Sequence, residues 1–273
     1  MTSGAVEVLD LRSKHRTLPP RPGHATVATM KTEMPAAARA ELAPGGKLRA
    51  ALNLANFLLV RKTPEGPRGI VPDIAAEIGR RAGVPVELVG YESPGQVADA
   101  APGGAWDVAF IGAEPARAAS VAFSAAYLEI EATYLVPAGS AIRALEEVDR
   151  PGVRIAASAR SAYDLYLGRT LKHAQLERAE GLDASFELFA SRGLEALSGL
   201  RPRLMQDLGK LPGARILEGR FTAVQQAIGT PKARAAAAAW LRAFAEEIKA
   251  SGLVAELIAR HAVRGVSVAP PAA

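Results

Sequence analysis

The residues best placed to carry chemistry lie in the stretch 111–127. The apolar run before it, residues 106–111, predicts a buried strand, and Gly112 at its end permits close backbone approach. A helix is expected to start near Pro115, where free backbone N–H groups favour an anion. Arg117 would lie in the first turn, where its planar guanidinium can pair with a carboxylate through two hydrogen bonds. The spacing predicts a carboxylate-binding site, although it also allows Arg117 to pair with the preceding glutamate or to lie on a solvated face.

Other kinds of site are not indicated by the residue types. The chain has no cysteine, which excludes disulfides, thiolate chemistry and cysteine-ligated metals. No Ser/His/Asp arrangement or phosphate-binding loop is recognisable. The four histidines are far apart and none has the HExxH spacing, so we expect neither a metal nor another cofactor. They are His15, His24, His173 and His261.

Composition places the chain among globular proteins. It has 273 residues, of which 49% are apolar and 22% charged, enough for one large domain or two lobes. The net charge of +5 is weak for this size. Lys and Arg form no block interleaved with aromatic residues, so nucleic acid is not an expected partner. No segment approaches the roughly 18 consecutive apolar residues of a membrane span.

Strands and helices are expected to alternate along the chain. Helix 71–82 has isoleucines at i and i+4 and a glycine, Gly83, suited to its end. Helix 161–171 begins with Ser161, a good capping residue. This alternation predicts an α/β protein with mostly parallel sheets flanked by helices, in two lobes with a cleft between them. The other expected strands are 48–54, 84–91, 127–136, 153–157 and 222–228, and the other helices are 96–101, 202–211 and 232–250.

The expected division of the chain follows these blocks. Residues 1–40 are expected to be a disordered N-terminal extension. Lobe 1 would comprise residues 46–137 and 226–262, and lobe 2 residues 138–225. Residues 263–273 would form a tail.

Several segments resemble one protein family in order and spacing. An arginine six residues before Phe-Ser-x-x-Tyr is matched by Arg117, Phe123, Ser124 and Tyr127. The chain thereby resembles the bacterial extracellular solute-binding proteins of family 3, the polar amino-acid binders of ABC importers. The resemblance covers roughly residues 46–262 and implies the periplasmic binding protein type II fold, with two hinge crossovers near 136–141 and 221–230. It is carried further by GKLRAALN (46–53) and by the segments 69–89, 142–167 and 221–230.

The resemblance implies roles for particular residues. Arg117 and the backbone N–H of Gly112 would bind the carboxylate of the ligand. Ser161 and Ala162 would hold the ligand from the second lobe. The family usually has a glycine directly before them, and this chain has Arg160 instead.

Further ligand contacts follow from the same resemblance. Glu195 would meet the α-amino group, because it lies in a G-x-x-E-A context where the family has G-x-x-D-A. Asn53, Asn56 and Phe57 lie in the loop that usually faces the ligand. Phe110 replaces a small hydroxyl residue in the strand before the glycine. The expected pocket therefore differs from that of common amino-acid binders.

The expected function is that of a monomeric solute-binding protein, not an enzyme, that closes over a small carboxylate-bearing ligand such as an amino acid. Its partner would be the permease of an ABC importer, and its location periplasmic. Residues 1–29 contain no apolar run typical of a signal peptide, so a cytoplasmic ligand sensor without a permease stays an alternative. A second alternative is an enzyme similar to cyclohexadienyl dehydratase, in which Glu195 would act as the acid or base.

Overall fold

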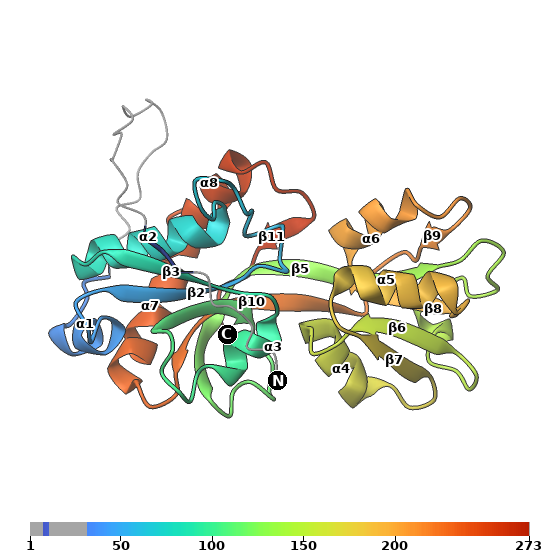
Figure 1. Cartoon of the computed structure of the whole chain (residues 1–273), viewed down its shortest axis with the longest axis horizontal. Coiled ribbons are helices and arrows are strands. Elements are labelled where there is room, and N and C mark those ends of the chain that lie inside the picture. Colours follow the sequence, from blue (N-terminus) through green and yellow to red (C-terminus); the bar gives the residue numbers. More distant parts are fainter. Residues whose placement is uncertain (1–7, 11–31, 273) are drawn as a thin grey trace.

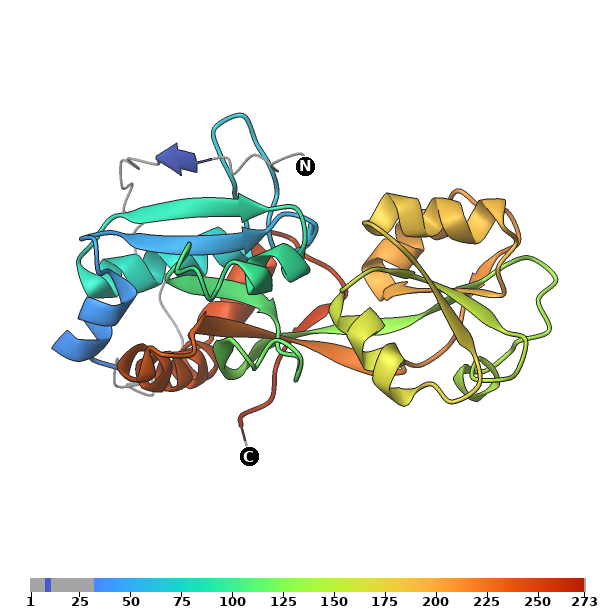
Figure 2. The ribbon, with the colours of Figure 1, turned by 60° about the horizontal axis from the view of Figure 1, so that its bottom comes forward.

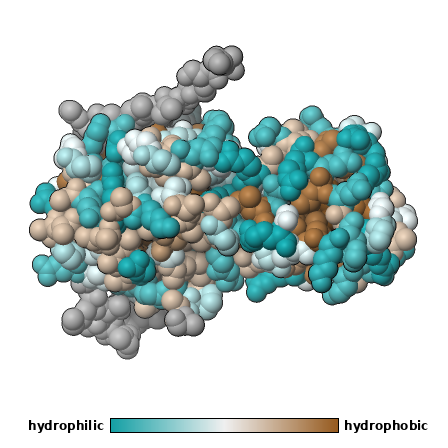
Figure 3. Space-filling model, turned by 90° about the horizontal axis from the view of Figure 1, so that it is seen from below, coloured by the Kyte–Doolittle hydropathy of each residue, from teal (hydrophilic) through white to brown (hydrophobic). Residues whose placement is uncertain are grey.

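Two long strands pass through the junction of the two halves of the molecule and organise it. The computed structural model describes residues 8–10 and 32–272. Strand β5 (Val121–Val136) pairs antiparallel with β10 (Thr222–Pro231). Figures 1 and 2 show these strands passing between two bodies, here called lobe 1 (residues 32–131 and 225–272, with 8–10) and lobe 2 (residues 132–224). In the space-filling view, a narrower waist joins the two lobes. Hydrophobic residues reach the surface at this waist and on the face of lobe 2 that is turned to the viewer (Figure 3).

Lobe 1 contains the larger part of the sheet, in the order β1-β3-β2-β4-β10-β5. β2 (Leu48–Asn53) is parallel to both β3 (Val86–Tyr91) and β4 (Val108–Gly112), whereas β1 (Val8–Asp10) runs antiparallel to β3. Side chains of β2 alternate between two hydrophobic clusters, one on each face of the sheet. One face is covered by α1 (Ala36–Leu42), α2 (Ile70–Ala82), α7 (Ala235–Ala250) and α8 (Leu253–Arg260), and the other by α3 (Pro94–Asp99).

Lobe 2 continues the same sheet in the order β5-β8-β6-β7. β6 (Arg154–Ser158) is parallel to β7 (Gln175–Ala179) and to β8 (Ala196–Leu200), and the short β9 (Arg215–Ile216) pairs with the end of β5. Leu167 of α4 (Ala162–Thr170) packs on one face of this sheet. On the other face pack α5 (Leu182–Ser191) and α6 (Arg201–Leu208). Each lobe is thus a sheet covered on both faces, as expected for α/β architecture.

The strand register sets which ends of the parallel strands meet. In lobe 1, β4 is antiparallel to β10, and its last residue, Gly112, lies opposite Gln226, near the entry of β10 from lobe 2. In lobe 2, β8 is antiparallel to β5, and its last residue, Leu200, lies opposite Ala132, near the exit of β5 from lobe 1. The carboxyl ends of both parallel sets therefore face one another across the junction, which is where ligands bind in such sheets.

The alternation of strands and helices expected from sequence is confirmed, and so is the mixed α/β fold class. Helix α2 ends as predicted: Gly83 follows it in the left-handed conformation, with φ 65°. Among the described residues, no helix is long and apolar enough to span a membrane.

Some expected bounds differ from the structure. β5 is a single strand of 16 residues that enters lobe 2 at Ala132, before the expected boundary at residue 137, because Ala132 already pairs with Leu200. Within the expected extension 1–40, the described residues contain β1 and the start of α1, and residues 1–7 and 11–31 lie outside the described part. The expected tail contains β11 (Val266–Val268), which pairs with β5 beside the junction.

A buried ion pair joins two of the lobe 1 helices. Arg81 at the end of α2 makes two hydrogen bonds of 2.7 Å to Glu247 of α7, and its guanidinium lies 4.8 Å from the ring centre of Phe244. Both charged side chains are about nine-tenths buried (10% and 7% exposed). Hydrogen bonds from Arg81 lower the pKa of Glu247 from 4.5 to about 2, against the opposing effect of burial.

Glu247→Gln should destabilise the protein by up to about 3 kcal/mol at pH 7, because the buried Arg81 would keep only Glu77, at 2.8 Å, as an ionic partner. Since folding lowers this pKa, the stabilisation is complete above pH 4.5 and is lost as the pH falls toward 2. Urea denaturation at pH 7 and pH 3 should therefore show a smaller difference between variant and parent at pH 3. Glu256→Gln, in an exposed pair with Arg260, is the matched control and should cost less than about 0.5 kcal/mol. Equal effects of the two variants would contradict the assignment.

Candidate ligand-binding cleft

The segment that carries Arg117 is a series of turns, so the predicted helix at residues 115–120 is wrong. Only residues 113–120 separate β4 from β5, and their hydrogen bonds are mostly of the turn type. The N–H of Arg117 donates to the carbonyl of Glu114 (2.9 Å), and that of Ser120 to the carbonyl of Arg117 (3.1 Å). These bonds form successive turns and no continuous helix, so the segment has no helix start with a row of free N–H groups.

Arg117 itself is buried at the junction of the lobes, with 4% of its surface exposed. Its Nη1 donates to the carbonyl of Gly112 (2.7 Å), and its Nη2 donates across the junction to the carbonyl of Arg160 (2.8 Å). Loss of hydration on burial lowers the pKa of Arg117 to about 10, with the charge of Glu114 acting in the opposite direction.

Arg117 makes no ion pair with the preceding glutamate. Glu114 pairs instead with Arg169 of α4 (2.7 Å). Among the described residues, the guanidinium of Arg117 has carbonyl partners but no carboxylate. Its positive charge is thus buried without a counter-ion.

The start of α4 faces Arg117 from lobe 2. The Oγ of Ser161 accepts the N–H of Asp164 (3.1 Å), which confirms the predicted cap. Ala162, the first helical residue, lies against Gly112: a Cβ added at residue 112 would come within 3.0 Å of the methyl of Ala162 and of Val224 Cγ1. Four residues expected in the site therefore come together here, namely Arg117, Gly112, Ser161 and Ala162.

Glu195 does not belong to this group, and its predicted role is wrong. It precedes β8, at the end of the strand remote from lobe 1. Its carboxylate accepts from Arg154 Nε (3.0 Å), Arg154 Nη2 (2.8 Å) and the Arg154 backbone N–H (2.8 Å). The residue of β8 that reaches the junction is Leu200. The G-x-x-E-A context identifies the strand, but the strand direction places its acid at the far end.

Phe110 is also not a cleft residue. It is 2% exposed and packs in the lobe 1 core, with its ring edge-on to Tyr127 at 6.4 Å between centres. Residues alternate along β4, so Phe110 and Gly112 have the same orientation, but the core extends over Phe110 and ends before Gly112.

The loop after β2 lies at the carboxyl edge of the lobe 1 sheet, as expected. Asn53 is the last residue of β2, and its Oδ1 accepts the N–H of Ala55 (3.2 Å). Asn56 is buried, and its Oδ1 has no hydrogen-bond partner within the described chain. Phe57 is partly buried. Contact of these three side chains with a ligand stays a prediction.

Arg160 is the junction residue that sequence reasoning did not assign. Its backbone has φ 58°, in the left-handed region that favours glycine, at a cost of roughly 1–2 kcal/mol. Its guanidinium crosses to lobe 1 and makes two hydrogen bonds of 2.7 Å to Asp99 of α3. A Cβ at Gly95 would lie only 2.9 Å from Arg160 Cζ, so this glycine makes room for the arginine. The sequence feature that could have indicated this inter-lobe contact is the arginine at position 160, where the family resemblance implies a glycine.

A cavity of about 190 Å³ lies at the junction beside these groups. It is lined by side chains of both lobes, among them Arg117, Arg160, Asp99, Ser120 and Leu165. This volume is below the roughly 300–1,000 Å³ of pockets for drug-sized ligands, and it suits a small molecule.

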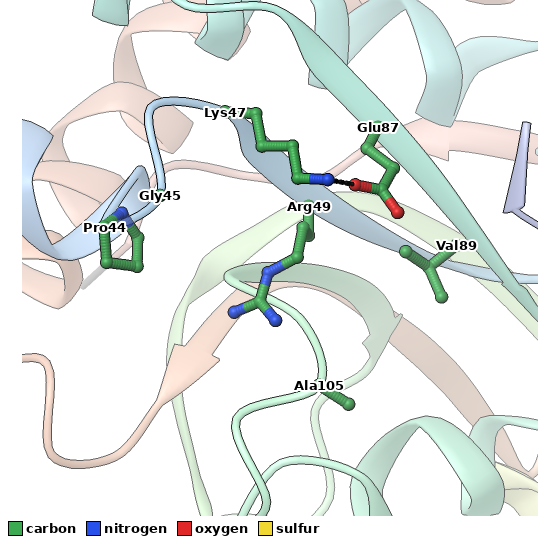
Figure 4. Close-up of a pocket in the computed structure, with 7 residues that line it drawn as sticks. All are labelled: Pro44, Gly45, Lys47, Arg49, Glu87, Val89 and Ala105. Carbon is green, nitrogen blue, oxygen red and sulfur yellow. Dashed lines mark ion pairs between the residues drawn. The ribbon is translucent and has the colours of Figure 1, made fainter. Parts of the chain in front are cut away.

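A larger hollow of about 590 Å³ lies elsewhere on lobe 1, near the amino ends of the strands (Figure 4). Its charged groups are already paired: Lys47 with Glu87 at 2.5 Å, and Arg49 with the buried Asp107 at 2.8 Å. It offers no free charge to a ligand. In the part of the chain that the structure describes, no cluster of three or more His, Asp or Glu side chains could hold a metal.

Asp99→Asn should shift the protein toward a more open form, because it removes the Arg160–Asp99 pair that ties the lobes together. Both side chains are more than half exposed (53% and 60%), so the pair contributes at most about 1 kcal/mol, equivalent to about fivefold in the ratio of closed to open molecules. Small-angle X-ray scattering should show a larger radius of gyration. Asp183→Asn, which removes the exposed partner of Arg203 within lobe 2, should leave it unchanged. The same radius in both variants would contradict a tie between the lobes.

The fold is similar to that of solved amino-acid-binding proteins. A mutant of ArgBP from T. maritima gives a TM-score of 0.66 at 22% identity, covering 82% of this chain and 98% of that chain. The ancestral amino acid-binding protein AncCDT-1, a precursor of cyclohexadienyl dehydratase, gives 0.66 at 21% identity, with 81% and 98% covered. The substrate binding protein of an amino acid ABC transporter gives 0.64 at 16% identity, with 79% and 98% covered. At such identities the likeness establishes the fold, that of the two-lobed type II periplasmic binding proteins.

Sequence comparison identifies the family. No curated protein sequence matches the chain. Residues 53–263, which include both lobes and Arg117, match the family described as bacterial extracellular solute-binding proteins, family 3. The chain therefore belongs to the bacterial extracellular solute-binding proteins of family 3.

Proposed function

We propose that this protein captures a small carboxylate-bearing molecule between its two lobes and delivers it to an ABC importer. The observation that carries the proposal is the buried guanidinium of Arg117, which has no carboxylate partner among the described residues. Carbonyl oxygens accept one hydrogen bond from Nη1 and one from Nη2, but they leave the charge uncompensated. Burying such a charge costs several kcal/mol, and an anionic ligand would offset that cost.

The start of α4 adds to the attraction for an anion. The first N–H groups of a helix have no partners within the helix, and the helix dipole makes this end positive. Ser161 occupies the N–H of Asp164, which leaves those of Ala162 and the next residue. A carboxylate between Arg117 and this helix end would receive hydrogen bonds from both lobes.

Several contacts must add up to a useful affinity. A hydrogen bond to a charged group contributes about 1.5–3 kcal/mol, whereas micromolar binding needs about 8 kcal/mol. Two pairs join the lobes, the exposed Arg160–Asp99 and Arg169–Glu114, in which the arginine is exposed. Such pairs would hold the closed form only weakly, so that the ligand itself decides the closure.

The hinge for this closure would lie in β5 and β10. Their pairing is interrupted by register shifts between Gln226 and Ala227 and between Ala227 and Gly229. Such irregularities bend a strand pair and favour local rotation.

Binding rather than catalysis is the activity we propose. The acid considered for an enzymatic role, Glu195, is held by Arg154 at the far end of β8. Within the described part of lobe 2, the cleft edge of that strand carries Leu200 in its place.

Replacing Arg117 tests the proposal. Arg117→Gln should abolish the thermal shift caused by a bound carboxylate, which for the parent at 100 times the dissociation constant corresponds to about 2.7 kcal/mol, or several degrees. Arg117→Lys should keep only part of it, because a lysine does not pair bidentately. Arg192→Gln, an exposed arginine paired with Glu177 in lobe 2, is the control and should behave like the parent. A ligand that binds all three variants equally would refute the site.

Delivery to a permease places the protein outside the cytoplasmic membrane, and we propose this location and a monomeric state. Cell fractionation of the host should recover the protein with markers of that space. Recovery with cytoplasmic markers would favour a ligand sensor that works without a permease.

A further inference from the structure

The acidic side chains of lobe 1 that reach the junction are already paired. Asp99 receives two hydrogen bonds of 2.7 Å from Arg160, which also lower the pKa of its carboxyl group. Glu114 pairs with Arg169 at 2.7 Å. Of the charges lining the junction cavity, Asp99 and Arg160 neutralise one another, and one positive charge, that of Arg117, is left over.

The acidic side chains of the hinge point away from the cleft. Glu129 and Glu131 of β5 flank Ile130, which lies opposite Val224 of β10. Because side chains alternate along a strand, both glutamates lie on the other face of the strand pair from Val224. On that face Glu129 accepts from Gln225 (2.9 Å) and Glu131 pairs with Arg201 (2.8 Å).

The acids of lobe 2 are no better placed. Asp164 in α4 is buried and pairs with Arg178 at 2.7 Å, and it also accepts the backbone N–H of Arg160 (2.9 Å). Glu195 lies five residues before Leu200, about 16 Å along the strand from the junction. Glu180, which follows β7, is exposed and makes no ion pair among the described residues, and its charge acts on Arg160 and not on Arg117. Within the described residues, the buried cation therefore has no buried, unpaired carboxylate beside it that could receive an ammonium group.

Apolar groups lie next to the polar groups of the cavity, on the side of Gly112. Leu200 packs against both the lobe 1 core and a small cluster that contains Ala162 and Val224. Ala162 and Val224 in turn contact Gly112, whose carbonyl holds Arg117. The neighbourhood of the guanidinium thus combines one unpaired positive charge with hydrocarbon surface.

We infer that the ligand is a carboxylic acid with an apolar body and no α-amino group, held by Arg117 at its carboxylate and by the Leu200 cluster at its body. This inference rests on the proposed function, since it assumes that the junction is the binding site. An α-ammonium group in this place would lose its hydration without gaining a carboxylate partner, and it would lie near a like charge. An alkyl or aryl group in the same position has no charge to desolvate, and burial of its apolar surface stabilises the complex.

Matched pairs of ligands test the inference on the full-length protein. Isothermal titration calorimetry would compare butanoate with 2-aminobutanoate, 4-methylpentanoate with leucine, and 3-phenylpropanoate with phenylalanine. In each pair that binds, the acid without the amino group should bind at least about tenfold more tightly, and binding should be lost in Arg117→Gln.

Three results would overturn the inference. The first is an amino acid that binds as tightly as its deaminated partner in an Arg117-dependent way, which would leave the proposed function standing. The second is an amino acid whose binding is lost in Asp99→Asn, because Asp99 would then hold the ammonium group. The third is the absence of binding by either series, which would count against the proposed function as well.

Introducing an acid at the junction gives an independent test. Leu200→Asp should shift the preference toward the amino acid of a pair by at least about tenfold, whereas the uncharged control Leu200→Asn should not. An unchanged preference in a folded Leu200→Asp variant would contradict the position given to this residue. If that variant does not fold, the ligand pairs with the parent protein decide the question alone.

Discussion

The antiparallel pairing of β5 with β10 is the constraint on which the rest of this structure depends. Both strands belong to the two lobes at once, so each lobe is built outward from one half of the pair. The pairing direction of β4 and β8 on these strands then brings the carboxyl ends of both parallel sets to the junction. The β5–β10 pair is the only sheet connection between the lobes in the described chain. It positions the site, and its irregular pairing is where we propose that the lobes rotate.

Arg117 converts this geometry into chemistry. It extends from a tight connection in lobe 1 and donates to a carbonyl in each lobe, so its burial depends on the lobes being close together. This guanidinium donates two hydrogen bonds to carbonyl oxygens and has no carboxylate partner among the described residues. In the proposed function, this uncompensated charge is what attracts an anionic ligand to the junction.

The contacts that tie the lobes are of a different kind. Arg160–Asp99 is an exposed pair, and Arg169–Glu114 combines an exposed arginine with a mostly buried glutamate. Exposed pairs contribute little, whereas the buried Arg81–Glu247 pair holds helices together within lobe 1. The strong ion pair thus lies inside lobe 1 and the weak ones between the lobes, an arrangement that suits the closure proposed above. Arg160 lies in the turn between β6 and α4, where its backbone is left-handed although the residue is not a glycine.

Local patterns in the sequence determined the helices and strands, the end of α2 at Gly83, the capping of α4 by Ser161 and the choice of Arg117 as the key cation. Each of these depends on residues within a few positions of one another, and periodicity or side-chain type records them directly. Only the tertiary structure decided that residues 113–120 form turns, that Phe110 lies in the core, and that Glu195 pairs with Arg154 far from the cleft while Leu200 reaches it. Those outcomes depend on which strands pair, in which direction and in which register, and such pairing joins residues that are distant in sequence and leaves no local pattern by which it could be predicted.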